Sequence, residues 1–343
     1  IPSPRQMVLS PQGNLIVGSF RDFSGGRESG VHAIVFGNET SDYQIIELLS
    51  DITLPSGVTI SQEGDLYIAA VNEIYRFPDI DSQLANDSSF QYELLTDELP
   101  DKLHHGWKYL RFGPDGLLYV PIGAPCNICV REDPYFTIVT LNITSDGKLV
   151  YPDTNVYPWE VYCNGVRNSV GFDFHPVTQE FWWTDNGRDW LGDDKPHDEL
   201  NRSYRRGLDF GFPYCYDDGI PDPNMNDDHN CDQYEKPAQL LDPHAAAIGM
   251  TFYTGDQFPQ KYQNAIFIAE HGSWNSDKPK GYAVSVVKLD STGVNATSYE
   301  KFLTGFVDQN TQIGCGRPAD VMVMPDGSIL VSDDHSNQIY RIS

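Results

Sequence analysis

Arginine and histidine recur at one position of a short sequence repeat, a few residues before the turn in each copy. The position is occupied, in chain order, by Arg5, Ser56, His105, Arg167, His244 and Arg317. Arginine binds carboxylates through paired N–H donors, and histidine accepts protons near neutral pH. Brought together, these side chains would bind an anion and supply a general base. The alternative is that each arginine forms a structural ion pair with a nearby carboxylate.

Each copy of the repeat consists of an apolar strand, a tight turn and a second apolar strand. The repeat occurs six times, and its clearest turns are Pro11-Gln12-Gly13, Gln62-Glu63-Gly64, Pro114-Asp115-Gly116 and Pro325-Asp326-Gly327. Such turns between alternating apolar residues predict β-hairpins, and their repetition indicates four-stranded blades. We therefore predict an all-β fold, a six-bladed β-propeller, with residues 1–343 as a single domain. Inner strands of a propeller converge on its axis, so the arginines and histidines would meet at one end of it.

The composition makes a cluster of cations unexpected. The chain has 23 Lys plus Arg against 49 Asp plus Glu, a net charge of −26. This acidity disfavours nucleic acid and anionic membranes as partners, and no apolar run approaches the about 20 residues of a membrane span. Because the first residue is Ile1 rather than Met, we expect a processed or excised chain.

Sequons and cysteines favour a secreted eukaryotic protein, which we expect to be glycosylated, extracellular and monomeric. The five sequons begin at Asn38, Asn86, Asn142, Asn201 and Asn295. The pair Cys126 and Cys129 fits a redox or zinc motif, although in a secreted chain a small loop-closing disulfide is favoured. Disulfides are also expected for Cys215–Cys231, which flank a polar excursion, and for the remaining pair, Cys163–Cys315.

Three further stretches place polar groups at strand ends. If His104 and His105 lie on a strand, only one can face the axis, and the repeat favours His105. The acid-rich loop around Gly187 offers carbonyl and carboxylate oxygens to a hard cation such as calcium, although its spacing is not that of an EF-hand. Glycines beside Trp274 and Arg317 would let a flat ligand approach the backbone.

Together these stretches resemble the quinoprotein sugar dehydrogenases that use pyrroloquinoline quinone (PQQ), of the sorbosone-dehydrogenase type and its secreted fungal pyranose dehydrogenase branch. The resemblance rests on His105 and on residues 112–116, 123–129, 166–168, 185–189, 198–201, 270–275, 316–318 and 332–334. It implies a PQQ- and Ca²⁺-dependent oxidoreductase that oxidises L-fucose, glucosone-like osones or rare pyranoses. The implied electron acceptor is a cytochrome b domain or a copper polysaccharide monooxygenase.

The resemblance also implies roles for individual residues. Arg5, Arg167 and Arg317 would hold the three carboxylates of PQQ, with further cofactor contacts from Asn168, His271 and Ser273. His105 would take the proton of the substrate hydroxyl while hydride passes from C1 of the sugar to C5 of the quinone. Arg167 would stabilise the charge that develops on the quinone oxygen. The main-chain carbonyls of Gly187 and Arg188 would hold calcium, which polarises the quinone.

One departure from the family pattern concerns the partner of His105. In the bacterial soluble glucose dehydrogenases an acid follows the Ile-Gly pair after the third repeat, whereas here Ile122-Gly123 is followed by Ala124. We expect Asp198 to orient His105 instead, and we do not transfer a preference for glucose.

Two other functions fit a six-bladed propeller. A calcium-dependent lactonase or phosphotriesterase would hold its metal on the axis with carboxylates and Asn, whereas this repeat places Arg and His there. A secreted ligand-binding propeller would have no reason for an axial cluster of cations. Absorbance of a bound cofactor would distinguish both from a quinoprotein.

Overall fold

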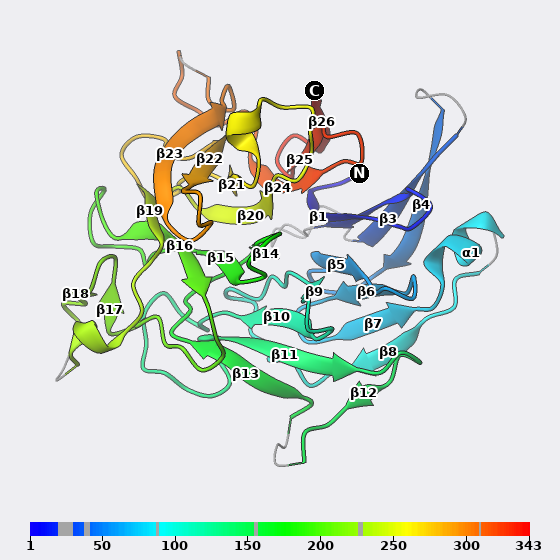
Figure 1. Cartoon of the computed structure of the whole chain (residues 1–343), viewed down its shortest axis with the longest axis horizontal. Coiled ribbons are helices and arrows are strands. Elements are labelled where there is room, and N and C mark those ends of the chain that lie inside the picture. Colours follow the sequence, from blue (N-terminus) through cyan, green and yellow to red (C-terminus); the bar gives the residue numbers. More distant parts are fainter. Residues whose placement is uncertain (20–29, 38–41, 87–88, 154–156, 226–228, 309) are drawn as a thin grey trace.

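The computed structural model of the chain describes residues 1–343 except 20–29, 38–41, 87–88, 154–156, 226–228 and 309. Its sheets are arranged around a central axis as the blades of a six-bladed β-propeller, with very little helix, so the predicted fold class is confirmed (Figure 1). No helix in the described ranges has the length and apolar character needed to cross a membrane.

The first three blades follow one another along the chain. The first blade contains β1 (Pro4–Leu9), β2 (Leu15–Ser19), β3 (Gly30–Phe36) and β4 (Tyr43–Ser50). The second contains β5 (Gly57–Ile60), β6 (Leu66–Ala69), β7 (Ile74–Phe77) and β8 (Glu93–Thr96), with α1 (Ile80–Ala85) before its last strand. The third contains β9 (Arg111–Phe112), β10 (Leu118–Ile122), β11 (Thr137–Ile143), β13 (Trp159–Asn164) and the short β12 (Leu149–Val150), which pairs with β11.

The other three blades complete the ring. The fourth contains β14 (Phe172–Phe174), β15 (Phe181–Asp185), β16 (His197–Ser203) and β19 (Gln239–Pro243), with β17 (Cys215–Tyr216), β18 (Ile220–Pro221) and η1 (Cys231–Gln233) in its long last connection. The fifth contains β20 (Ala247–Phe252), β21 (Ile266–Glu270), β22 (Ala283–Leu289) and β23 (Ala296–Leu303), with η2 (Gln260–Tyr262). The sixth contains β24 (Pro318–Val323), β25 (Ile329–Asp333) and β26 (Gln338–Ile342).

Neighbouring blades pack through apolar side chains that alternate along each strand. Trp182 and Trp183 on β15 illustrate this, because adjacent residues of a strand point to opposite faces. Trp183 packs in the core that the fourth blade shares with the third, and Trp182 packs against Met250 and Ile268 of the fifth. Two large consecutive apolar residues thus fill two separate inter-blade cores.

The predicted hairpin turns are present between the first two strands of four blades. In each turn a glycine has a positive φ, which L side chains rarely adopt. The glycines are Gly13, Gly64, Gly116 and Gly327, with φ values of 88°, 90°, 79° and 83°. These turns set the register that brings the segment before each inner strand to the same end of the axis.

The ring is closed by contacts between β1 and β24, and among the described strands none is exchanged between the first and sixth blades. The backbone N–H of Met7 donates to Oδ2 of Asp320 at 2.9 Å, and that of Ser3 donates to Oδ1 of Asn337 at 2.8 Å. The two chain ends therefore lie near each other in Figure 1.

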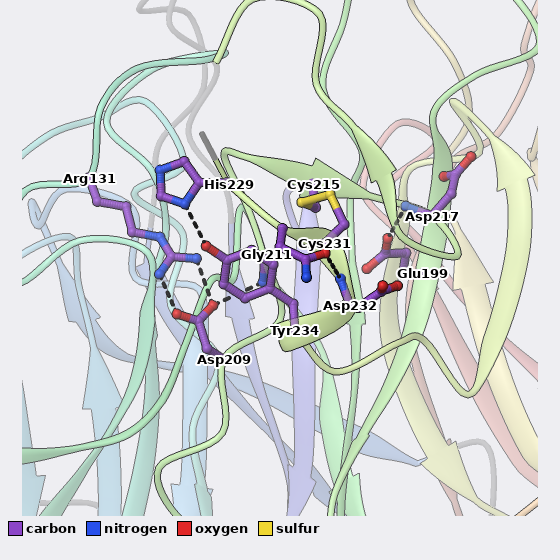
Figure 2. Close-up of a disulfide and its surroundings, with 11 residues drawn as sticks. Arg131, Glu199, Asp209, Gly211, Cys215, Asp217, His229, Cys231, Asp232 and Tyr234 are labelled. Atoms are coloured by element: carbon purple, nitrogen blue, oxygen red, sulfur yellow. Dashed lines mark hydrogen bonds and ion pairs between the residues drawn. A yellow bond between two sulfur atoms is a disulfide. The ribbon is translucent and has the colours of Figure 1, made fainter. Parts of the chain in front are cut away.

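Two of the three predicted disulfides are confirmed, Cys126–Cys129 and Cys215–Cys231. Figure 2 shows the second beside Glu199 and Asp217. The predicted Cys163–Cys315 bridge is wrong. Cys163 is buried on β13 in the core between the third and fourth blades, whereas Cys315 is exposed before β24 in the sixth blade, on another side of the ring.

The predicted sequons differ in their exposure. Asn86, Asn142 and Asn295 are exposed, whereas Asn201 is fully buried on β16, where its Nδ2 donates to Glu199 at 3.1 Å. Asn38 lies outside the described residues. Since a glycan needs a solvent-exposed asparagine, Asn201 is not an acceptor in the folded protein.

Candidate active site

A cavity of about 670 Å³ lies where the segments before the inner strands of the third to sixth blades meet. Most of the sequence-predicted site residues contribute to its wall. Its lining comprises Leu103, His104, His105, Trp107, Arg167, Asn168, Asn186, Gly187, Asp189, Asp198, His244, Ala246, His271, Gly272, Trp274, Asn275 and Arg317. Arg5, Ser273 and Arg188 are not in this lining.

His105 lies in a turn before β9 and has a positive φ of 52°. Its Nδ1 is 2.9 Å from the backbone oxygen of Ala124, which follows β10. Because a carbonyl oxygen can only accept, Nδ1 carries the proton, and Nε2 of the neutral ring is left as an acceptor. Burial and the positive charge of Arg167 hold the pKa of His105 well below its usual range. His105 is therefore a neutral base at neutral pH.

The orienting role predicted for Asp198 thus falls to the carbonyl of Ala124. Both carboxylate oxygens of Asp198 accept backbone N–H groups, from Gly187 at 3.0 Å and from Ala247 at 2.9 Å. Burial raises the pKa of Asp198 to about 7. Asp198 therefore connects the loop after β15 to the first residue of β20, while still lining the cavity.

His104 also lines the cavity, contrary to the prediction that alternation turns it away. The two imidazoles are adjacent, with ring centroids 4.1 Å apart. Alternation does not apply here, because both residues lie in a turn rather than on a strand. Burial lowers the pKa of His104, with a further contribution from Arg167.

Arg167 is fixed at the cavity wall by the loops on either side of it. Its guanidinium donates to the backbone oxygen and to Oδ1 of Asn127, at 3.1 and 2.9 Å, and to the backbone oxygen of Asn186 at 3.1 Å. The carboxylate of Asp189 is 3.7 Å away. The three hydrogen bonds of the Arg167 guanidinium thus go to neutral acceptors, and its ion pair with Asp189 is longer.

Arg317 is also held by neutral acceptors. It donates to the backbone oxygens of His271, at 2.9 Å, and of Gly272. Its guanidinium forms no salt bridge with any carboxylate in the described part of the chain. Like Arg167, it lines the cavity, but its charge has no carboxylate partner within the described residues.

Arg5 instead forms a structural ion pair with a nearby carboxylate, the alternative considered for each arginine. Its guanidinium lies 2.7 Å from Asp334, and both side chains are buried. Asp334 also contacts Nε2 of His271 at 2.8 Å. His271 and Arg5 together lower the pKa of Asp334, although burial opposes this shift. Arg5 therefore supports His271 from behind the cavity wall.

Gly187 lines the cavity, whereas the side chain of Arg188 turns away and donates to Asp222 and Asn224, at 2.8–3.0 Å. Within the described ranges no group of three or more His, Cys, Asp and Glu residues is placed to hold a metal ion. A cation at this loop would therefore depend on backbone carbonyls and on oxygens of a ligand.

A family model described as TrAA12-like matches residues 1–343. The chain belongs to the TrAA12-like family. A relative of this TrAA12-like chain, an uncharacterized protein of Borreliella burgdorferi, is 31% identical over 358 residues that cover 100% of the chain and 86% of that protein. A PQQ-dependent pyranose dehydrogenase of Coprinopsis cinerea is 29% identical over 175 residues, which cover 40% of the chain and only 23% of that enzyme.

Solved structures share the fold of this TrAA12-like propeller. The holo PQQ domain of the Coprinopsis cinerea pyranose dehydrogenase has a TM-score of 0.77 and 20% identity, covering 99% of the chain and 92% of that domain. A calcium structure of a Trichoderma reesei enzyme of family AA12 has a TM-score of 0.79 and 19% identity, with the same coverage. The predicted membership among quinoprotein sugar dehydrogenases is confirmed, while a fungal origin stays a prediction because the relative that spans the chain is bacterial.

Two residues at or next to the cavity wall of the TrAA12-like propeller were given no role from the sequence, Asp189, which lines the cavity, and Asn127, which does not. Asp189 lies in the acid-rich loop, where sequence alone does not separate a cavity residue from a solvated one. Asn127, which holds Arg167, lies between the bridged Cys126 and Cys129. Its position inside that small disulfide loop was the available signal.

Proposed function

We propose that this chain is a PQQ- and Ca²⁺-dependent dehydrogenase that oxidises a pyranose or an osone at C1. One observation carries the proposal. In a protein of net charge −26, the wall of this one cavity combines two arginines, Arg167 and Arg317, with a neutral, oriented histidine. This combination suits an anionic redox cofactor and a substrate that loses a proton.

The side chains present fit PQQ, a planar quinone with three carboxylates. Arg167 and Arg317 would pair with carboxylates, and charge-assisted bonds of this kind are the strong ones. Asn168 lines the cavity, and its buried Oδ1 has no hydrogen-bond partner in the described residues, whereas its Nδ2 donates to Asn186. Oδ1 is therefore available to a donor group of a ligand. Arg5 is assigned a supporting role because Asp334 neutralises it.

The calcium part of the proposal depends on the loop after β15. Hard oxygen donors suit Ca²⁺, and here they would be the carbonyls of Gly187 and Arg188 together with oxygens of the cofactor. Asp189 and Asp198 add negative charge to the same wall. Ser273 and His271 are retained as expected cofactor contacts, although only His271 is among the residues that line the cavity.

When bound, PQQ supplies the two-electron acceptor for the hydride of the sugar. A residue of this chain would then accept the proton of the sugar hydroxyl. Nε2 of His105 would accept the proton of the C1 hydroxyl, while the bond from Nδ1 to Ala124 holds the ring in that tautomer. The Arg167 guanidinium would stabilise negative charge that develops nearby, as an oxyanion donor does.

Substrate, acceptor and location extend the proposal. We expect L-fucose, glucosone-like osones or rare pyranoses as substrates, and a cytochrome b domain or a copper polysaccharide monooxygenase as the one-electron acceptor. We also propose that the protein is extracellular, in keeping with its two disulfides, since these persist in oxidising compartments.

The test is an absorbance titration of the cofactor-free protein with PQQ, with calcium and with a chelator. The quinone spectrum should shift on binding in calcium, and addition of L-fucose or an osone should then reduce it. Equal binding in chelator would overturn the calcium assignment. No binding of PQQ in either condition would overturn the cofactor and leave a hydrolase or a binding propeller.

A further inference from the structure

Two tryptophans stand exposed at the cavity. Trp190 and Trp274 are 68% and 66% exposed, whereas the other four tryptophans are buried or half-buried. Their rings meet edge to face, with centroids 5.4 Å apart and planes at 87°. Trp274 also belongs to the cavity lining. Trp190 and Trp274, together called the aromatic corner below, thus extend the cavity wall outward.

The corner is held in place by contacts between its two loops. Lys280 donates to the backbone oxygen of Asp193 and lies 3.5 Å from the carboxylate of Asp194. The backbone N–H of Asp277 donates to Oδ2 of Asp193 at 3.1 Å. Trp190 itself has a positive φ of 70°, a conformation that costs free energy in a non-glycine residue. The contacts between the two loops therefore hold both rings in exposed positions despite the unfavourable backbone conformation of Trp190.

A polar acceptor lies beside this aromatic corner. Asn275 lines the cavity, and its Oδ1 is buried and has no hydrogen-bond partner among the described residues. Leaving a buried acceptor unsatisfied is unfavourable, so the position suits a ligand that brings a donor. Aromatic faces and amide acceptors together match a sugar, whose ring has an apolar C–H face and hydroxyl donors at its edge.

We propose that Trp190, Trp274 and Asn275 form a subsite for the sugar ring that follows the reacting ring. The substrate is then the end of an oligosaccharide rather than only a free monosaccharide. The inference rests on the proposed function, since it assumes that the cavity takes a sugar. The acidic groups around the corner, Asp189, Asp193 and Asp194, add acceptors for hydroxyl groups.

The first test measures binding and needs no cofactor. Calorimetry on the cofactor-free protein compares glucose, cellobiose and cellotriose, and in parallel the maltose series. The longer sugars of one series should bind more tightly than glucose. Trp190→Ala and Trp274→Ala should each remove about two- to tenfold of that gain. Trp190→Ala should also leave glucose binding unchanged, because Trp190 is not among the residues that line the cavity. Tyr43→Ala, at an exposed aromatic residue on β4, is the matched control and should change nothing.

The second test uses the PQQ-loaded enzyme and separates substrate from electron acceptor. Stopped-flow absorbance gives the rate of quinone reduction by each sugar and the rate of reoxidation by an acceptor. The tryptophan replacements should lower kcat/KM for the oligosaccharides in the first step only. Equal binding of short and long sugars by the wild type, or an effect confined to reoxidation, would overturn the subsite. Failure of PQQ to bind would contradict the proposed function, while the calorimetric comparison would still decide the subsite.

Discussion

Nδ1 of His105 donates to the backbone oxygen of Ala124 over 2.9 Å, and this bond fixes the tautomer of the imidazole. A backbone carbonyl cannot take up a proton or lose one in the working pH range. A carboxylate partner would stabilise the imidazolium, whereas a carbonyl stabilises it less, which keeps His105 neutral and ready to accept a proton.

Replacement of His105 by Gln should leave PQQ binding intact and slow reduction of the bound quinone by about two to four orders of magnitude, because the amide lacks a basic nitrogen. Single-turnover absorbance with L-fucose or an osone measures this rate. His104→Gln is the control at the neighbouring imidazole, and it should lower the rate by no more than about tenfold, since His104 shares the cavity but lacks the Ala124 bond. A larger loss in His104→Gln than in His105→Gln would reassign the base.

The rate of quinone reduction should keep its full value down through pH 6.5 and fall only in more acidic solution. The pKa of His105 is lowered below 6.5, first by burial and then by Arg167, so protonation of the base begins at lower pH than for a free imidazole. Arg167→Gln removes one cause of this lowering, so its acid limb should move to higher pH while its rate falls. A pH profile of single-turnover rates checks both points. An acid limb above pH 7 in the wild type would contradict them.

Arg317→Gln should weaken PQQ binding by about 10- to 100-fold, the range expected for a lost charge-assisted bond, with little change in stability. Arg5→Gln should leave PQQ binding largely intact but destabilise the protein, because it breaks a buried pair with Asp334. The expected loss of unfolding free energy is about 3 kcal/mol. Titration of PQQ absorbance and urea unfolding followed by fluorescence separate the two effects. Similar losses of affinity in both variants would place Arg5 at the cofactor.

A thiol reagent should modify one cysteine in the folded protein and two after unfolding without reductant. Cys315 is exposed, whereas Cys163 is buried, and burial raises the pKa of its thiol far above that of a free cysteine. Peptide mapping after alkylation identifies the modified residue. Cys315→Ser should abolish labelling of the folded protein. Labelling of neither cysteine after unfolding would restore the predicted Cys163–Cys315 bridge.

The blades and most of the cavity wall were predictable because both depend on local, repeated signals. Turns such as that at Gly116 set the strand pairs, and the segment before each inner strand then supplies His105, Arg167 and Arg317. What sequence could not resolve were contacts between distant segments. The pairing of Arg5 with Asp334 joins residues 329 positions apart, and the alternation that excluded His104 failed because a turn replaces the strand there.

The junction between β1 and β24 has a consequence for how this protein is made. A ribosome releases the first blade well before the sixth, so Met7 and Asp320 can meet only after the first strand of the sixth blade has been made. Until then the β1 flank of the first blade lacks its neighbour and leaves apolar surface uncovered. The cavity, whose wall extends from His105 in the third blade to Arg317 in the sixth, is likewise incomplete until the sixth blade has been made. Binding of the proposed cofactor therefore requires that the sixth blade has been made.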